Sequence, residues 1–208
     1  MERIATTPRP DWQTQIESLG LNAQLKNTNS DWNEEVCYRF SAREIQELKN
    51  ATDEIQQRCL ELVEDIILKK RYVELRICDR FWPLIEDSWL KGERSLYGRL
   101  DFSYDGSSPP RLLEYNADTA LGLLESSLFQ KQWLAQVKPC AEQFNHIHSD
   151  LLAAWRRINS AQIHLACYTE YQEIFFNVTY LANTVREAGF SPTVIDFEHF
   201  SWDGQMFF

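Results

Sequence analysis

The sequence predicts a mixed α/β fold, on three observations. A long segment in the first half of the chain has apolar residues at the period of a helix. Two short segments in the middle have a period of two on either side of a turn sequence, which is the pattern of a β-hairpin. The last third reads as strand, helix and strand, and such a unit implies a parallel sheet.

The long helix is expected over residues 41–70. Ser41 can cap its first turn while Glu44, three residues further on, bonds back to the cap, which makes a capping box. Apolar residues then recur every three or four positions and predict a face packed on a core: Ile45, Leu48, Ala51, Ile55, Cys59, Val63 and Ile66. The pattern leaves residues 79–93 open, since Pro83 lies there among large aromatic residues.

The hairpin is expected from strands at 97–104 and 111–116, joined by the turn sequence Asp-Gly-Ser-Ser-Pro-Pro. Two helices should follow, over 119–137 and 141–157, with Pro139 ending the first of them.

The strand, helix and strand of the last third are expected over 162–168, 175–187 and 191–197. Gly189 follows the helix and is expected to end it. Asp203-Gly204 then predicts a further turn.

The composition excludes several classes of partner. A net charge of −10 argues against nucleic acid and against anionic membranes, and it tolerates a cationic substrate. No apolar run approaches the roughly 20 residues that cross a bilayer. Five scattered cysteines form no CxxC pair, which suits a reducing cytoplasm. The oligomeric state cannot be predicted.

The hairpin separates polar from apolar side chains if its strands pair symmetrically about Ser107 and Ser108. That register places Asp101 opposite Glu114 and Arg99 opposite Asn116 on one face. The other face pairs apolar residues, Phe102 with Leu113 and Leu100 with Tyr115. A slip of one residue would mix the two faces, so the pattern itself favours this register.

Two facing carboxylates repel each other, and a hard cation would relieve that repulsion. The oxygens of Asp101, Glu114 and Asn116 form a set that suits Mg²⁺, and Arg99 could bind a phosphate or an acyl phosphate. The alternative is a solvated sheet face with a surface ion pair, which spacing alone favours. Asp118 or Thr119 could also cap the next helix and open an anion site at its N-terminus.

These segments resemble the glutathionylspermidine synthase family. The family pattern is close to YGRFDF, then LLEYNADT, then LLE, and the matching segments here are Tyr97–Phe102, Leu112–Thr119 and Leu123–Glu125. Further matches are Arg9–Trp12, Trp32–Glu34 with Tyr38 and Phe40, and Glu173 ahead of Tyr180 and Leu181.

The resemblance implies a circularly permuted ATP-grasp ligase with an inserted pre-ATP-grasp-like domain. Residues 1–140 would hold the helical segment and the metal-site hairpin, and residues 141–208 an incomplete pre-ATP-grasp-like βαβ domain. ATP would phosphorylate a carboxylate of a peptide or other acid, and a small-molecule amine would displace the phosphate. ATP would be the co-substrate and Mg²⁺ the cofactor.

The resemblance also implies roles for individual residues. Asp101, Glu114 and Asn116 match the Mg²⁺ ligands, with Asp101 also at the ATP phosphates. Arg99 matches the catalytic arginine at the transferred phosphate, and thus contacts both ATP and substrate. Thr119 and Glu173 match substrate-binding positions.

Two positions depart from the family pattern. Leu121 replaces a small hydroxyl residue, and Ile174 replaces an acid. A site without these polar groups discriminates poorly for glutathione and spermidine, so the acid and the amine stay open.

The 208 residues would lack the family's main nucleotide-binding part, and we expect this chain alone to be inactive as a ligase. Two other functions stay open. One is a non-catalytic binding module or a degenerate relic of the family. The other is a metal-dependent hydrolase, for which the sequence offers no evident histidine base.

Overall fold

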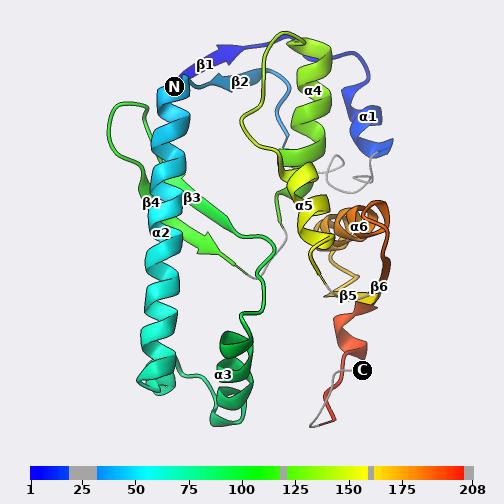
Figure 1. Ribbon diagram of the computed structural model, residues 1–208. Helices are drawn as coiled ribbons and strands as arrows, with labels where there is room; N and C mark the ends of the chain where they lie inside the picture. Colours follow the sequence, from blue (N-terminus) through cyan, green and yellow to red (C-terminus); the bar gives the residue numbers. More distant parts are fainter. Residues whose placement is uncertain (19–31, 118–120, 159–161, 204–208) are drawn as a thin grey trace. The chain divides into compact units, whose positions relative to one another are not determined.

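The computed structural model describes residues 1–18, 32–117, 121–158 and 162–203 (Figure 1). The fold is mixed α/β, as predicted, and in the described residues the strands form two-stranded sheets. The chain forms two compact units. Unit 1 comprises residues 1–2 and 39–117, and unit 2 comprises residues 3–38 and 118–208. The predicted boundary between domains at residue 140 falls inside unit 2, and it stays a prediction.

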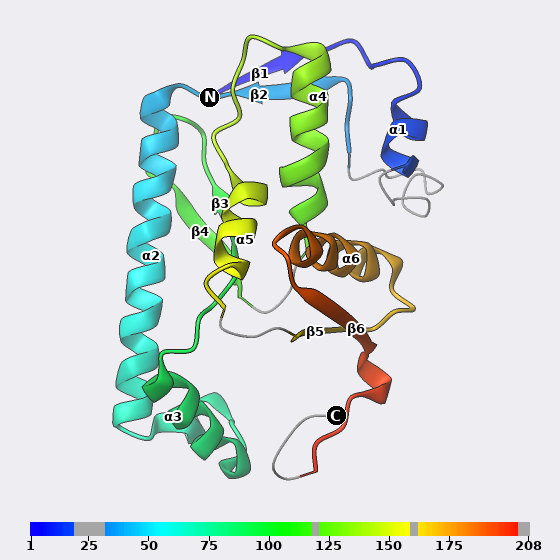
Figure 2. The ribbon, with the colours of Figure 1, turned by 45° about the vertical axis from the view of Figure 1, so that its right-hand side comes forward.

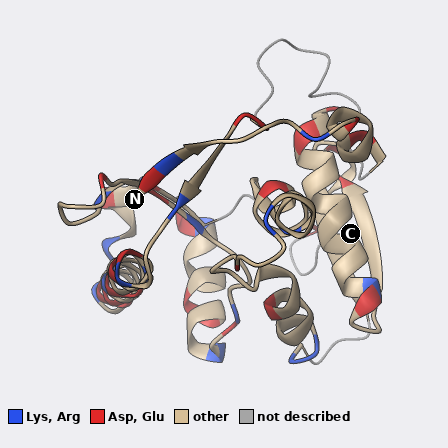
Figure 3. Cartoon of the chain, turned by 90° about the horizontal axis from the view of Figure 1, so that it is seen from above, with Lys and Arg blue, Asp and Glu red and all other residues tan. Residues whose placement is uncertain are grey.

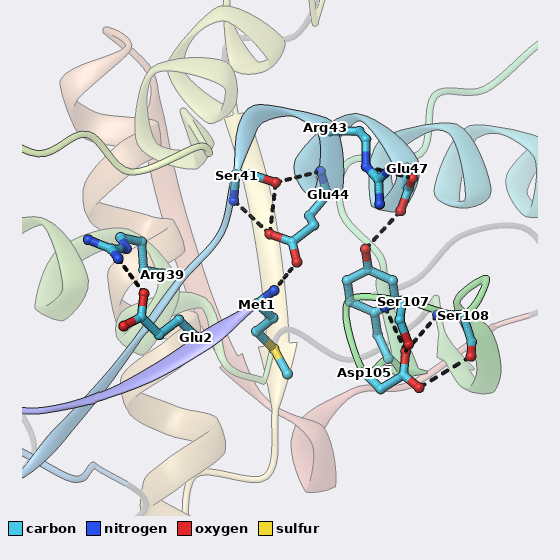
Figure 4. Close-up of polar contacts among 11 residues, drawn as sticks. Met1, Glu2, Arg39, Ser41, Arg43, Glu44, Glu47, Asp105, Ser107 and Ser108 are labelled. Carbon is cyan, nitrogen blue, oxygen red and sulfur yellow. Dashed lines mark hydrogen bonds and ion pairs between the residues drawn. The ribbon is translucent and has the colours of Figure 1, made fainter.

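Unit 1 is built on α2 (Ala42–Leu68), which confirms the predicted helix. The capping box is present, because Ser41 Oγ accepts from the Glu44 N–H (3.3 Å) and Glu44 Oε2 accepts from the Ser41 N–H (2.7 Å). Both contacts are drawn in Figure 4. They satisfy backbone groups that the first helical turn would otherwise leave without a partner.

Most of α2 is stabilised by interactions between its own side chains, with little burial. The apolar stripe is mainly half-buried, and only Ile66 and Ile67 near the C-terminal end are buried among the apolar residues of α2. Charges of both signs cover the exposed side (Figure 3). Four ion pairs join residues one turn apart, and each contributes a few tenths of a kcal/mol: Arg43–Glu47, Lys49–Asp53, Glu54–Arg58 and Asp65–Lys69.

The core of unit 1 lies where α2 ends. The open segment forms η3 (Asp79–Phe81) and α3 (Trp82–Lys91), which follow the 3₁₀ turn η2 (Arg71–Leu75). Tyr72 is fully buried and stacks on Trp82, with ring centroids 5.0 Å apart. Unit 1 also holds β3 (Arg99–Ser103) and β4 (Arg111–Asn116), the predicted hairpin.

Unit 2 contains the predicted parallel pair, β5 (Gln162–Cys167) and β6 (Ser191–Asp196). The helix α6 (Gln172–Glu187) connects them and packs on both strands (Figure 2). The 3₁₀ turn η5 (Phe197–His199) follows β6. The turn predicted at Asp203-Gly204 reaches beyond the described residues.

Two predicted helices of unit 2 have other bounds than expected among the described residues, which resume at Leu121. The first is the π-helical turn η4 (Glu125–Phe129) followed by α4 (Gln130–Val137). The hydroxyls of Ser126 and Ser127 donate hydrogen bonds to the carbonyls of Gly122 and Leu123. These bonds compete with the backbone hydrogen bonds of the helix and explain its irregular first turns.

The second of these helices is α5 (Ile147–Trp155). The residues before it are not helical, because Gln143 Nε2 donates to the carbonyl and side-chain oxygens of Asn145 (3.2 and 3.0 Å). Further along, Trp155 Nε1 donates to Thr184 Oγ1 (2.8 Å) and joins α5 to α6.

The strands β1 (Glu2–Ala5) and β2 (Val36–Arg39) pair, and α1 (Trp12–Ser18) lies between them in sequence. A buried ion pair holds this part of unit 2 together. Arg9 Nη2 and Nε bind Glu34, whose side chain is 1% exposed, and Trp32 Nε1 donates to the same carboxylate (2.7 Å). Arg9 Nη1 also reaches Gln136 of α4 (3.2 Å).

No helix among the described residues is both long and apolar enough to cross a membrane.

We expect Ser41→Ala to lower the free energy of unfolding by about 1 kcal/mol, because it removes the acceptor of the α2 cap. Ser41→Asp keeps an acceptor and serves as the matched control. Urea unfolding of both variants measures the effect, and equal stabilities would contradict the role of the cap.

Glu34→Gln is expected to lower stability by about 3 kcal/mol at pH 7, because it leaves the buried Arg9 charge unpaired. Burial alone would raise the pKa of Glu34, but hydrogen bonds from Arg9 and Trp32 hold this pKa below its usual 4.5. A lowered pKa contributes stability above the unfolded pKa, and this stability is lost as the pH falls through the folded pKa.

The difference between the parent and Glu34→Gln should therefore narrow as the pH falls below about 4.5. Urea unfolding across this pH range measures it, with the exposed neighbour Glu35→Gln as the control. A difference that stays constant down to acid pH would contradict the account of Glu34.

Candidate active site

The hairpin brings together the four polar residues that the sequence singled out. Arg99 pairs with Asn116 and Asp101 with Glu114, as predicted, and Leu100 pairs with Tyr115. Asp101 and Glu114 therefore lie directly across from each other. Because side chains alternate along a strand, all four polar side chains share one face of the hairpin.

The predicted pairing of Phe102 with Leu113 is wrong. Phe102 pairs with Leu112, because a β-bulge interrupts the register next to Asp101 and leaves Leu113 as the extra residue. A symmetrical fold about the turn could not foresee one additional residue in β4. The four polar residues lie on the far side of the bulge from the turn, so their register is unaffected.

The turn is closed by Asp105. Its Oδ1 accepts from the N–H groups of Ser108 (2.7 Å) and Ser107 (2.8 Å), which are drawn in Figure 4. These backbone hydrogen bonds, from Ser108 first, lower the pKa of Asp105 well below its usual range. Gly106 has φ +83°, and a Cβ there would lie 2.6 Å from the Met1 nitrogen and 2.7 Å from Glu44 Oε1. The turn thus packs closely on the start of α2.

Arg99 neutralises Asp101, its neighbour on the same face of β3. Its Nε and Nη2 donate to the two carboxylate oxygens of Asp101 at 2.9 and 3.2 Å, in a parallel fork. The hydrogen bond to Asp101 is the main reason why the pKa of Arg99 is raised. Both side chains are more than a third exposed, so a ligand can approach them from solvent.

The ion pair between Arg99 and Asp101 was not among the expectations from the sequence. Glu114 is exposed, and its charge is the less well compensated of the two. The spacing of side chains on one strand explains the result, because residues two apart on a strand point the same way.

The polar face suits a hard cation by its donor chemistry. Two carboxylates and one amide lie at neighbouring positions on one face of the hairpin, and Mg²⁺ prefers such oxygen ligands with several waters. The described residues contain no group of three or more His, Cys, Asp or Glu that could hold a metal, so the amide of Asn116 has to complete the set. A cation at Asp101 would compete with the guanidinium of Arg99 for the same oxygens.

Two tyrosines attach the hairpin to α2. Tyr104 Oη donates to Glu47 Oε2 (2.9 Å), and Tyr115 Oη donates to Gln56 Oε1. The tyrosines lie on opposite sides of the bulge, so the helix supports both parts of the hairpin. Sequence reasoning did not identify Glu47 or Gln56, because both are polar residues on a helix that carries many polar residues.

Of the three predicted substrate-binding residues, Arg99 lies on the hairpin described above, and Thr119 and Glu173 come later in the chain. Thr119 falls outside the described residues. Glu173 is exposed in the first turn of α6, and its role stays a prediction.

Asn177, one turn after Glu173, is 1% exposed and was missed by the sequence reasoning. Its Oδ1 accepts from the N–H groups of Leu123 (3.1 Å) and Leu124 (3.3 Å), and its Nδ2 donates to the Glu173 carbonyl (3.0 Å). Asn177 therefore holds the segment after Thr119 against the helix that carries Glu173. An asparagine on the apolar face of a predicted helix was the signal that could have revealed it.

We expect Asp101→Ala to lower the free energy of unfolding by less than about 1 kcal/mol, because the exposed pair with Arg99 contributes little to stability. Urea unfolding measures the effect, with Ser41→Ala as the reference. A loss larger than that of Ser41→Ala would mean that Asp101 serves the fold.

Comparison with known proteins identifies the relatives of this chain. It matches the family described as glutathionylspermidine synthase preATP-grasp over residues 3–207. A putative acid–amine ligase of Haemophilus influenzae is 34% identical over 202 residues, which cover 92% of this chain and 51% of that protein.

Two further relatives are more distant. Trypanothione synthetase of Crithidia fasciculata is 27% identical over 126 residues, which cover 59% of this chain and 19% of that protein. The bifunctional glutathionylspermidine synthetase/amidase of Escherichia coli is 23% identical over 191 residues, which cover 88% of this chain and 30% of that protein.

The chain spans about half the length of the Haemophilus ligase and less of the other two proteins. The mixed α/β fold agrees with the family match, which extends over nearly all of the 208 residues. This chain belongs to the glutathionylspermidine synthase preATP-grasp family.

Proposed function

We propose that this chain carries the Mg²⁺ ligands and the phosphate-binding arginine of an ATP-dependent ligase that joins an acid to an amine. The observation that carries the proposal is the pairing of Asp101 with Glu114 across the hairpin, beside Arg99 and Asn116. Two facing carboxylates weaken a sheet unless a cation or a positively charged side chain lies between or beside them. The relatives that share the family include an acid–amine ligase and two synthetases, which supports the choice of reaction.

In the proposed reaction, Asp101, Glu114 and Asn116 would hold Mg²⁺, which would supply positive charge beside the ATP phosphates. The carboxylate of the acid takes the terminal phosphoryl group of ATP, and ADP leaves. The amine then attacks the carbonyl carbon of the acyl phosphate, inorganic phosphate leaves, and an amide remains.

Arg99 has the geometry for the phosphate in this scheme. It already binds a planar pair of anionic oxygens in a parallel fork, which is the arrangement that a phosphoryl group also offers. If Asp101 held a cation, the guanidinium of Arg99 would be available to bind the transferred phosphate. Developing negative charge on that group would then be stabilised by a preformed donor.

The proposed substrates are a peptide or another small acid and a small amine, bound in part by Thr119 and Glu173. Ile174 is half-buried beside Glu173 and offers no polar group. We therefore leave glutathione and spermidine out of the proposal. The thiols of the five cysteines are free, which agrees with a cytoplasmic enzyme.

The test measures metal binding by the 208-residue chain, because the proposed metal ligands all lie within it. Mn²⁺, which takes the same oxygen ligands and is paramagnetic, is titrated while free Mn²⁺ is followed by electron paramagnetic resonance. We expect saturable binding that Mg²⁺ displaces, and we expect Asp101→Ala and Glu114→Ala to lose it.

Glu173→Ala is the control. It removes an exposed carboxylate from α6, outside the hairpin, and should leave Mn²⁺ binding unchanged. Binding that survives both hairpin variants, or the absence of saturable binding, would overturn the proposed function. A non-catalytic module or relic would then be the better description of the chain.

A further inference from the structure

The side of the hairpin opposite the polar face carries a second set of contacts. Tyr115 lies between Glu114 and Asn116 on β4, and its side chain points the other way, toward α2. Its hydroxyl donates to Gln56 Oε1, and both side chains are half-buried. One tyrosine thus connects two predicted metal ligands to a helix of 27 residues.

The ring of Tyr115 also lies directly on the backbone of Gly98, just before β3. A Cβ on Gly98 would be 2.9 Å from Tyr115 Cε2, 3.2 Å from its hydroxyl oxygen and 3.5 Å from the Asn116 carbonyl oxygen. Gly98 is the residue before Arg99, and its lack of a side chain lets the ring approach. The ring therefore packs on the residue that leads into the strand with Arg99 and Asp101.

The bulge explains why β4 needs this support. Leu113, the extra residue, immediately precedes Glu114, so the strand ladder is disrupted beside the carboxylate. Leu113 itself is 70% exposed, so its side chain contributes little packing to the strand. The direction of the Glu114 side chain thus depends on the contacts that residues 114–116 make on the opposite face of the hairpin.

We infer that the Tyr115–Gln56 hydrogen bond, with the Tyr115 ring seated on Gly98, positions Glu114 and Asn116 for binding the divalent cation. Tyr115 and Gln56 are positioning residues, since they act through the two ligands and do not touch the cation. The inference rests on the proposed function, because it assigns a role toward the proposed metal site.

The hairpin offers a matched control for this role. Tyr104 also donates its hydroxyl to a side chain of α2, Glu47, but it lies on the turn side of the bulge, away from the ligands. Tyr104→Phe and Tyr115→Phe each remove one hydroxyl and keep the ring. The two variants should lose comparable stability, whereas only Tyr115→Phe should weaken binding of the cation.

The experiment titrates Mn²⁺ alone into the 208-residue chain and its variants. We expect Tyr115→Phe and Gln56→Leu to weaken Mn²⁺ binding roughly tenfold, the lower end of what loss of an outer-shell partner costs. Gln56→Glu keeps an acceptor for the hydroxyl and should bind Mn²⁺ like the parent, as should Tyr104→Phe. The double variant Tyr115→Phe/Gln56→Leu should be no weaker than either single one, because both remove the same bond.

The outcomes separate this inference from the proposed function. If the parent binds Mn²⁺ and Tyr115→Phe binds as well as Tyr104→Phe, the metal site stands and the positioning role is overturned. If the parent shows no saturable binding, the proposed metal site falls and the positioning role falls with it. Thermal unfolding of every variant identifies loss of fold, and Gln56→Leu, which leaves the packed ring untouched, decides the question if Tyr115→Phe does not fold.

Discussion

The antiparallel register of β3 and β4 is the constraint on which the candidate site depends. It places Asp101 opposite Glu114 and Arg99 opposite Asn116, and a shift of one residue would send these groups to the other face. The hydrogen-bond ladder alone does not secure this register, because a bulge interrupts it beside the carboxylates. The tyrosine contacts with α2 hold the strands on both sides of the interruption.

The supporting helix obtains its stability mostly without a core. It is capped by Ser41 and Glu44 and has ion pairs along its exposed side, whereas its buried apolar residues lie near the C-terminal end. A support of this kind can carry a polar site on its partner hairpin without an apolar layer around that site. The residues of the site then remain open to solvent and to ligands, as the exposure of Arg99 and Asp101 shows.

The residues that carry the family resemblance divide into two groups in the structure. Arg9 and Glu34, from segments far apart in sequence, form a buried ion pair that joins the segments in unit 2, which is a role in the fold. Arg99, Asp101 and Glu114 lie on an accessible face, where ion pairs typically contribute little to stability. A resemblance in sequence does not distinguish the two groups, but burial does.

Sequence reasoning succeeded where one strong periodicity dominated. The alternation from Arg111 to Asn116 gave β4 with its observed bounds, and Ser41 with Glu44 located the start of α2. It did not foresee the π-helical turn at Ser126 and Ser127, whose hydroxyls donate to the backbone carbonyls of Gly122 and Leu123. It also missed the bulge, although two adjacent apolar residues, Leu112 and Leu113, interrupt the alternation at that point.

The supports of the site escaped prediction for a different reason. Gln56 and Asn177 are defined by partners that are distant in sequence, on β4 and in the segment before η4. Gln56 is one of many polar residues on α2, and the place of Asn177 on an apolar helix face indicates burial but not the identity of its partner. Arg99 and Asp101 were found because their chemistry is visible within a single strand, although their mutual ion pair was not foreseen.

The most direct test of the central claim is to locate a Mn²⁺ ion by its anomalous X-ray scattering in crystals of this chain. The account predicts a peak on the polar face of the hairpin, about 2.1 Å from oxygens of Asp101, Glu114 and Asn116, with Arg99 released from Asp101. A peak at other residues, or an intact Arg99–Asp101 pair in crystals that hold Mn²⁺ elsewhere, would contradict it.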